Sequence, residues 1–244
     1  MRLLAMETAT SAQSVALVGD DRVLAELSYE AKGNRGGLLL PTVDQVLQTA
    51  GLTARDLDAV AVSVGPGSFT GLRVGLATAK GLALGSGARL AGVSTLEALA
   101  EGYALTDGTI CALLDAYRGE VYMAMFRRVG AGGALERLSP DAVLPPEAVV
   151  PALAEIEGSV HVIGNGAARY RERLQAALGD RVRLTEEGLC AAPSALVVAR
   201  LGLRQLAAGP APDAEVALRY LRRSEAEVNW EKGLLKSPLA KVSR

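Results

Sequence analysis

The stretch from Ala59 to Leu84 constrains the fold more strongly than any other part of this sequence. Its first six residues form an apolar run that predicts a buried strand. A glycine-rich turn, Gly65-Pro66-Gly67, follows, and from Phe69 the pattern predicts a helix. A strand, a glycine-rich turn and a helix N-terminus together can hold an anion on backbone N–H groups. The same segment can also serve close packing of the helix, so both interpretations have to be weighed.

The spacing of the turn matches no standard nucleotide loop. A Walker A loop places a lysine directly after its last glycine, whereas the first lysine after these glycines is Lys80. A dinucleotide loop needs a third glycine where Thr70 stands, and it follows the first strand of its unit. An anion or nucleotide contact is therefore kept only as an alternative. Its residues would be Gly65, Gly67, Ser68 and Thr70.

The helix that follows favours close packing. Small residues recur every four positions, at Gly71, Gly75, Ala79 and Ala83. Glycine inside a helix costs about 1 kcal/mol relative to alanine, so a close approach to this backbone would justify it. Its only charged residues, Arg73 and Lys80, share one narrow face, and a helix this apolar needs burial on nearly all sides. We expect one side to lie on its own sheet and another to meet a helix or a second subunit.

The preceding helix, which ends near Ala50, is also more apolar than one core-facing stripe requires. Two such helices on one face of the first half would leave an exposed apolar patch and predict association with another chain. The alternative, that packing within the chain buries both helices, stays open. The residues expected at the interface are Leu39, Val43, Val46, Leu47, Gly71, Leu72, Gly75, Leu76, Ala79 and Leu82.

The two halves of the chain share one order of elements. Residues 1–104 and residues 105–244 both read as three strands followed by helix, strand, helix, strand and helix, without an obvious sequence repeat. Two such units with a cleft between them form the architecture of the actin, sugar-kinase and Hsp70 superfamily, in which each half is ribonuclease-H-like. We therefore expect an α/β fold of two ribonuclease-H-like lobes. A short helix or strand at 216–222 and an irregular charged end should follow.

The turns after the first strand of each half carry the acidic candidates. Kinases of that superfamily hold phosphate with an aspartate and glycines in this turn. The first turn, Glu7–Ser11, has no glycine, and the second, Asp115–Gly119, has a tyrosine and an arginine where phosphate needs room. No complete phosphotransfer site is expected. Glu7 and Asp115 remain candidates for an acid–base pair or a Mg²⁺ site across the cleft, or for polar strand ends without a catalytic role.

Composition excludes several other classes of protein. The 244 residues are 50% hydrophobic with a net charge of −1, so nothing global favours nucleic acid or an acidic membrane. No apolar run is long enough for a membrane span or a signal peptide, which predicts a cytoplasmic protein. Cys111 and Cys190 are expected to be buried free thiols, and His161 a structural residue in a strand. We expect no metal site, and we expect the basic cluster Arg219, Arg222 and Arg223 to be a solvated surface.

Several motifs together resemble the TsaB (YeaZ) family of bacterial proteins of threonylcarbamoyladenosine tRNA modification. The long segment Gly65–Gly75 is similar to the signature of that family. Further similar segments are Leu4–Thr8, Leu39–Pro41, Leu114–Tyr122, Gly164–Ala167 and Arg219–Arg222. The resemblance covers most of the chain. It departs from the family pattern at Glu7, where an aspartate is usual, and at Gly33–Gly37, where a His-Ser pair is common.

The resemblance implies a non-catalytic partner subunit. Members are similar in fold to TsaD, which transfers threonylcarbamoyl to adenosine 37 of tRNAs that read ANN codons. This chain has one histidine and so lacks the metal-binding histidines of TsaD. The family implies a homodimer, or a heterodimer with TsaD, formed through the two helices of the first half. That assembly recruits the ATPase TsaE and reaches tRNA only indirectly.

Two further expectations complete this picture. The chain should carry no cofactor of its own, although an adenine nucleotide at the interface of the complex is compatible with the resemblance. A different class of function, a small-molecule kinase or ATPase that uses the cleft between the lobes, is the alternative. It predicts ATP turnover that is lost in Glu7→Ala and Asp115→Ala. Glycoproteases, a description also attached to this family, find no support, because one histidine in a strand offers no nucleophile–base pair.

Overall fold

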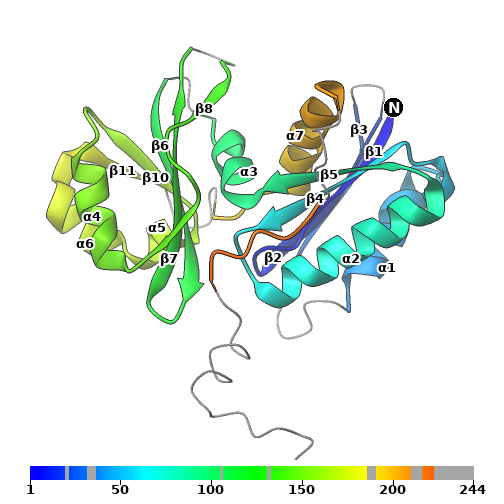
Figure 1. The fold of residues 1–244 in the computed structure, drawn as a ribbon, viewed down its shortest axis with the longest axis horizontal. Coiled ribbons are helices and arrows are strands. Elements are labelled where there is room, and N and C mark those ends of the chain that lie inside the picture. The colour runs from blue at the N-terminus through cyan, green and yellow to red at the C-terminus, as the bar shows by residue number, and fades with distance from the viewer. Residues whose placement is uncertain are drawn as a thin grey trace, which may run out of the picture.

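Two lobes, each built on one mixed β-sheet, lie side by side in the computed structural model (Figure 1). The structure describes residues 1–19, 22–31, 37–104, 107–130, 133–185, 191–209 and 216–222. In these ranges no helix is long and apolar enough to cross a membrane. The predicted α/β fold with two lobes of the same element order is confirmed.

The first lobe has a five-stranded sheet with the order β3-β2-β1-β4-β5. Its strands are β1 (Arg2–Glu7), β2 (Ala12–Gly19), β3 (Arg22–Glu30), β4 (Ala59–Gly65) and β5 (Arg89–Ser94). The first three pair antiparallel, and β4 and β5 extend the sheet in parallel beside β1. Every residue of β4 is buried, because helices cover both faces of the sheet.

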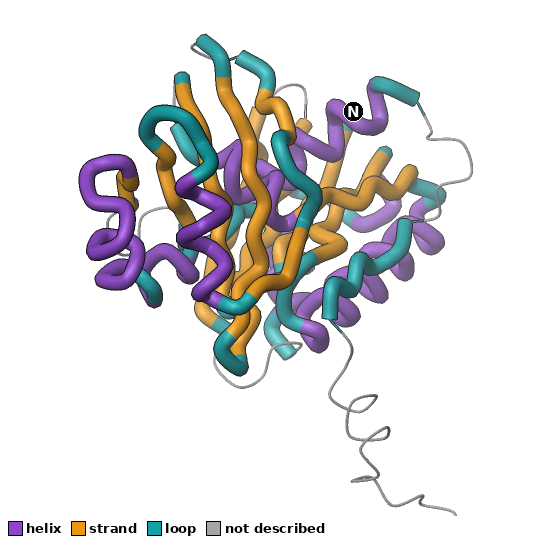
Figure 2. The backbone as a smooth tube through the Cα atoms, turned by 60° about the vertical axis from the view of Figure 1, so that its left-hand side comes forward, coloured by secondary structure: helices purple, strands orange, loops and turns teal. Residues whose placement is uncertain are grey.

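Three helices supply that cover. α1 (Leu39–Thr49) and α2 (Phe69–Ser86) pack on one face, where their apolar side chains meet alternate residues of β1, β2 and β4. A one-turn 3₁₀ helix, η1 (Ala54–Asp56), lies between α1 and β4. The opposite face is covered by α7 (Ala195–Ala207), which comes from the other end of the chain. Figure 2 shows the same layering from a second direction.

The second lobe repeats the plan around strand β6. The sheet order is β11-β10-β6-β7-β8, and β9 pairs with the N-terminal part of β7. Its strands are β6 (Gly108–Tyr117), β7 (Glu120–Arg128), β8 (Leu135–Arg137), β9 (Ala142–Leu144), β10 (Val160–Ile163) and β11 (Val182–Leu184). One face is covered by α4 (Pro146–Ala154), α5 (Asn165–Arg169) and α6 (Arg171–Leu178), with the 3₁₀ helix η2 (Gly179–Arg181) before β11.

The last helix of each half packs on the sheet of the other half. α3 (Thr95–Gly102) buries Leu96 and Leu99 against β6 and β7, whereas α7 buries Val198 and Leu201 against the first sheet. The two helices contact each other between the sheets (Figure 1). A division at residue 104 therefore separates the two sheets but not the helices that cover them. This corrects the assignment of all of 105–244 to the second lobe.

Local differences from the sequence-based expectation are small. The element order of the second half predicts one helix between β10 and β11, whereas the structure has two, α5 and α6, which meet at Tyr170. Strand β9 is a fourth strand where the order predicts three. Residues 216–222 run without helix or strand, so neither predicted element forms there. Cys111 is a buried free thiol as expected, and burial raises its pKa to about 12. Cys190, Arg223 and the loop 33–36 lie outside the described residues.

Candidate functional site

The turn between β4 and α2 is held between two other parts of the chain. The N–H of Ser68 donates to the carbonyl oxygen of Ala9 at 2.7 Å, and a Cβ on Gly67 would overlap the same carbonyl. On the other side, Gly65 has φ +117° and a Cβ there would overlap the carbonyl oxygen of Arg219. Ser68 then caps α2, its Oγ accepting from the N–H of Gly71 at 3.3 Å. These two glycines are therefore explained by close packing within the chain.

The first two glycines of α2 serve the same purpose. A Cβ on Gly71 would overlap the carbonyl oxygen of Thr8, and a Cβ on Gly75 would overlap its Oγ1. α2 thus lies unusually close to the end of β1. The expected close approach is real, but its partner is the turn after β1 and not a second subunit.

Nine of the ten residues predicted at the partner interface are buried inside this chain; only Leu82 is partly exposed. Those of α1, together with Leu76, Ala79 and Leu82 of α2, pack on the first sheet, and Gly71 and Gly75 lie against Thr8. The side-chain assignment is therefore wrong, because helices that are apolar on several sides do not reveal from sequence which side faces their own sheet. Leu76→Glu would place a carboxylate in the core and would test folding, not association.

The outward face of the same two helices carries different residues. On α1 the exposed apolar side chains are Leu38, at its N-terminal boundary, and Leu40, 49% and 60% exposed. On α2 Leu84 is 88% exposed. From Arg73 to the C-terminus of α2, the exposed residues are Arg73, Ala77, Lys80, Gly81, Leu84 and Gly85. We call Leu38, Leu40 and these six residues the outer helical face.

Packing between the described residues does not require glycine at two positions of the outer helical face. A Cβ on Gly81 or on Gly85 would meet no atom of the described residues within 4 Å. Glycine at such positions costs about 1 kcal/mol relative to alanine and leaves a flat backbone surface. Beside the exposed Leu84, that surface suits a neighbouring helix that approaches closely.

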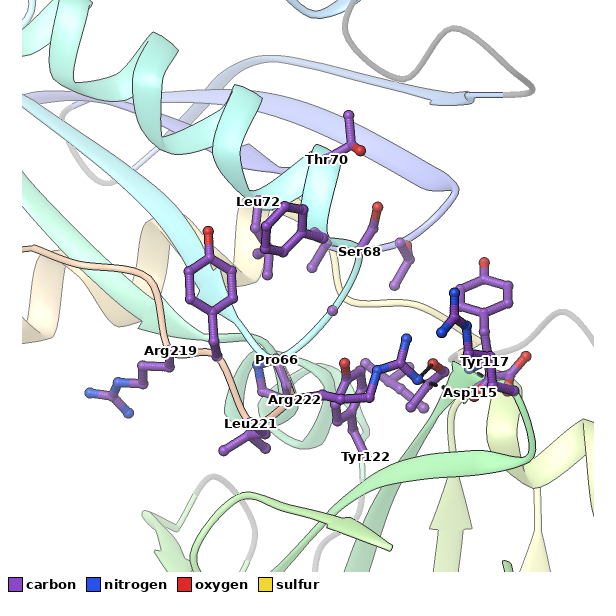
Figure 3. A pocket seen from close by; sticks show the side chains of 18 of the residues that line it. Pro66, Ser68, Thr70, Leu72, Asp115, Tyr117, Tyr122, Arg219, Leu221 and Arg222 are labelled. Atoms are coloured by element: carbon purple, nitrogen blue, oxygen red, sulfur yellow. Dashed lines mark hydrogen bonds between the residues drawn. The ribbon is translucent and has the colours of Figure 1, made fainter. Parts of the chain in front are cut away.

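A pocket of about 410 Å³ lies between the two lobes (Figure 3). One wall is the start of α2, and a second is the turn between β6 and β7, including Asp115 and Tyr117. Arg219–Arg222 form a third. Of the four residues considered for an anion, Gly67, Ser68 and Thr70 line this pocket, and Gly65 does not. An anion at this turn stays a prediction.

The two candidate carboxylates do not form a pair. Glu7 is completely buried in the first lobe, where its carboxyl group accepts from the N–H of Ala9 at 2.6 Å and from the hydroxyl of Ser63. Burial is the main cause that raises its pKa to about 7, and the two hydrogen bonds oppose the increase. It does not line the pocket. The interpretation of Glu7 as a cleft residue facing Asp115 is therefore wrong.

Asp115 does line the pocket. Its carboxylate and its backbone N–H both bond to other residues of the second lobe. One carboxylate oxygen lies 2.6 Å from Nη1 of Arg169, and the other accepts from the N–H of Tyr117 at 3.0 Å. Its own N–H donates to the side chain of Asn165 at 2.8 Å. These bonds fix the turn in which Tyr117 and Arg118 both have φ +59°. Asp115 therefore has a clear structural role in shaping this wall of the pocket.

Other reactive groups are also held in structural contacts. Nδ1 of His161 lies 3.0 Å from the hydroxyl of Tyr103, and burial, with a smaller effect from Arg183, lowers the pKa of the imidazole. Among the residues that the structure describes, no group of three His, Cys, Asp or Glu side chains is placed to hold a metal ion.

The segment 216–222 is the part of the site that sequence reasoning missed. Arg222 was expected in a solvated basic cluster, yet its guanidinium donates to the carbonyl oxygen of Ala116 at 2.9 Å and lies 3.1 Å from a carboxylate oxygen of Glu120. Apolar residues interleaved with the arginines, Val216, Leu218 and Leu221, were the signal that this segment packs against the lobes.

Comparison with known proteins gives a consistent picture. Residues 31–230 match the family model described as TsaD: tRNA N6-adenosine threonylcarbamoyltransferase. The chain is similar to the tRNA threonylcarbamoyladenosine biosynthesis protein TsaB of Escherichia coli K12, with 41% identity over 170 residues, 68% of this chain and 72% of that protein. It is 32% identical to TsaB of Bacillus subtilis 168 over 235 residues, 94% of this chain and 98% of that protein.

Solved structures extend the likeness to the fold. YeaZ from Pseudomonas aeruginosa matches with a TM-score of 0.75 and 29% identity over 90% of this chain and 99% of that one. A ROK hexokinase from Thermus thermophilus matches with a TM-score of 0.50 at 12% identity, over 84% of this chain and 100% of that one. The hexokinase likeness concerns the fold alone and agrees with the expected superfamily.

Proposed function

Because this chain belongs to the TsaB (YeaZ) family, we propose that it is a non-catalytic subunit of the machinery that makes threonylcarbamoyladenosine in tRNA. Its partner is TsaD, which it binds through the outer helical face of α1 and α2. Without TsaD the same face joins two copies of this chain. The assembly recruits TsaE, reaches tRNA through TsaD, and is compatible with an adenine nucleotide at the interface.

The observation that carries this proposal is the unexplained surface of α2. Gly81 and Gly85 lie open beside Leu84, whose side chain is 88% exposed, and α1 adds Leu38 and Leu40 on the same side of the sheet (Figure 1). Exposed apolar side chains and open glycines on the outward side of two neighbouring helices are typical of a surface that another helix covers. Arg73 and Lys80 place two positive charges on this face.

Two substitutions test the face, with a matched control. Gly81→Arg and Leu84→Glu place bulk or charge on the outer helical face without touching the core, so both should weaken binding to TsaD and the homodimer at least tenfold. Val129→Glu puts the same charge on a residue that is 64% exposed in the second lobe and should leave both unchanged. Co-purification with TsaD and analytical ultracentrifugation measure these effects. Normal association of folded Gly81→Arg and Leu84→Glu would refute the assignment.

The absence of catalysis has its own test. The positions of Glu7 in the core and of Asp115 in its ion pair support a structural use of both carboxylates. The purified chain alone should then turn over no ATP, and tRNA modification by TsaD should require this chain in any form that keeps the outer helical face. ATP turnover that is lost in Asp115→Ala would favour the kinase or ATPase alternative instead.

A further inference from the structure

We propose that residues 216–222 form a clamp that holds the two lobes in one arrangement and fixes the width of the cleft. These seven residues run from the first lobe to the second along one wall of the pocket (Figures 1 and 3). They have no helix or strand of their own, so their path is set by the contacts they make with each lobe. The clamp acts within a single chain, and its test is independent of any partner.

The first half of the clamp is anchored to the first lobe by its backbone and its apolar side chains. The N–H of Arg219 donates to the carbonyl oxygen of Val64 at 2.8 Å, at the end of β4. The carbonyl of Arg219 lies against Gly65, where a Cβ would overlap it. Val216 and Leu218 pack on the apolar cluster beneath α1 and α2. This end therefore follows the first lobe in any movement.

An aromatic contact ties the clamp to the start of α2. The rings of Tyr220 and Phe69 lie 5.1 Å apart, and the hydroxyl of Tyr220 accepts from Nε of Arg73 at 2.8 Å. The guanidinium of Arg73 also stacks on Phe69, 3.7 Å from the ring centre. The clamp is therefore in direct contact with α2, the helix whose outward face is proposed to bind the partner.

The other end is anchored to the second lobe. Leu221 packs on the apolar cluster between α3 and the second sheet. Arg222 donates to the carbonyl oxygens of Ala116 and Tyr117, at 2.9 and 3.4 Å, and pairs with Glu120 across the β6–β7 turn. Because Tyr220 and Arg222 are only two residues apart, the lobes cannot separate at the cleft unless one of these anchors breaks.

The experiment measures the distance between the lobes by pulsed electron paramagnetic resonance. Spin labels at Gln45→Cys on α1 and Gln175→Cys on α6 report on opposite lobes, and both positions are exposed. Cys190 is replaced by serine, while Cys111 is fully buried and does not compete for label. The labelled chain is diluted with an excess of unlabelled chain, so that a homodimer carries at most one labelled copy, and the otherwise unmodified chain should then give one narrow distance distribution.

Breaking both anchors should change that distribution. In Tyr220→Ala/Arg222→Ala it should broaden and shift to longer distances, whereas Arg219→Ala should leave it unchanged. The side chain of Arg219 extends away from Asp115 and Tyr122 (Figure 3), so this control removes a neighbouring charge but no anchor. An unchanged distribution in the folded double variant, or an equal change in Arg219→Ala, would overturn the proposal.

A milder variant covers the case in which the double variant does not fold. Arg222→Gln removes the guanidinium contacts with Ala116, Tyr117 and Glu120 and leaves the contacts of Tyr220 in place. Circular dichroism establishes that it is folded, and its distribution should shift in the same direction by a smaller amount. A distribution identical to that of the parent chain would then refute the clamp.

Discussion

Among single residues, Glu7 is the carboxyl group most completely removed from water in the part of the chain that the structure describes. It is enclosed at the end of β1, with hydrogen bonds from Ser63 and from the N–H of Ala9. Burial raises its pKa from an ordinary value of 4.5 to about 7. Between these two values the folded chain keeps a proton on Glu7 that the unfolded chain has released, so folding is less favourable as the pH rises.

This environment predicts a pH dependence of stability. The contribution of protonated Glu7 is complete below pH 4.5 and is lost as the pH rises through about 7, a change of about 3 kcal/mol as an upper bound. Glu7→Gln mimics the protonated form, because its amide oxygen can accept from the N–H of Ala9 and its amide N–H can donate to the hydroxyl oxygen of Ser63. The difference in unfolding free energy between Glu7→Gln and the parent chain should grow by about 2 kcal/mol between pH 5 and pH 8.

Urea denaturation at several pH values measures that difference. Other groups, such as His161, titrate in both proteins and cancel in the comparison. A difference that stays constant from pH 5 to pH 8 would show that Glu7 does not titrate in this range in the folded chain.

At the scale of elements, α2 carries two sets of glycines with opposite roles. Gly71 and Gly75 face Thr8 at the end of β1, whereas Gly81 and Gly85 face outward with open space above them. In sequence the two sets look alike, since each is a pair spaced four residues apart within one apolar helix. Only the rotation of the helix on the sheet distinguishes them.

Alanine substitutions separate the two sets. Gly71→Ala and Gly75→Ala should each destabilise the chain by about 1–3 kcal/mol, because the added methyl group has no room. Gly81→Ala should stabilise it by about 0.5–1 kcal/mol, because alanine favours the helix and meets nothing. Thermal or urea denaturation measures all three.

A second-site change sharpens this test. The methyl group added in Gly75→Ala would collide with the side-chain hydroxyl of Thr8. The methyl group added in Gly71→Ala would collide with the backbone carbonyl of Thr8. Thr8→Ala should therefore recover part of the stability lost in Gly75→Ala and none of that lost in Gly71→Ala. Equal recovery in both would mean that α2 shifts as a whole and that the two contacts are not distinct.

At the scale of the whole molecule, a buried ionic cluster joins the elements that cross between the lobes. Glu101, in α3, pairs with Arg128 of β7 at 2.8 Å and with Arg204 of α7 at 2.6 Å. The side chains of Glu101 and Arg128 are each only 9% exposed. Arg128 also donates to the carbonyl oxygens of Gly133 and Glu101. Since α7 covers the first sheet and β7 belongs to the second, this cluster links both lobes.

Removing the carboxylate of Glu101 should destabilise the fold. Glu101→Ala leaves the buried guanidinium of Arg128 without its counter-charge and should lower the free energy of unfolding by about 3–5 kcal/mol. Glu147→Ala breaks an exposed pair with Arg173, whose charged atoms lie 3.8 Å apart, and should change it by less than about 1 kcal/mol. Urea denaturation compares the two, and similar values would show that burial of the Glu101 cluster does not matter for stability.

Most elements could be predicted from the sequence, because strands and helices follow from local hydrophobic period and capping. Strand 59–64 and helix 69–84 are found within two residues of their predicted positions. The family resemblance rested on a long local motif and is likewise confirmed by the relatives. Local signals of this kind do not depend on how the elements are later brought together.

The two-lobed α/β fold and the family of the chain could therefore be predicted from local patterns alone. The outward sides of α1 and α2, the exchange by which α3 and α7 cover each other's sheets, the burial of Glu7 and the path of residues 216–222 across the cleft became visible only in the folded chain. These features depend on contacts between residues far apart in the sequence. Several rotations and pairings bury similar apolar area, and close packing at positions such as Gly71 and Gly202 selects among them.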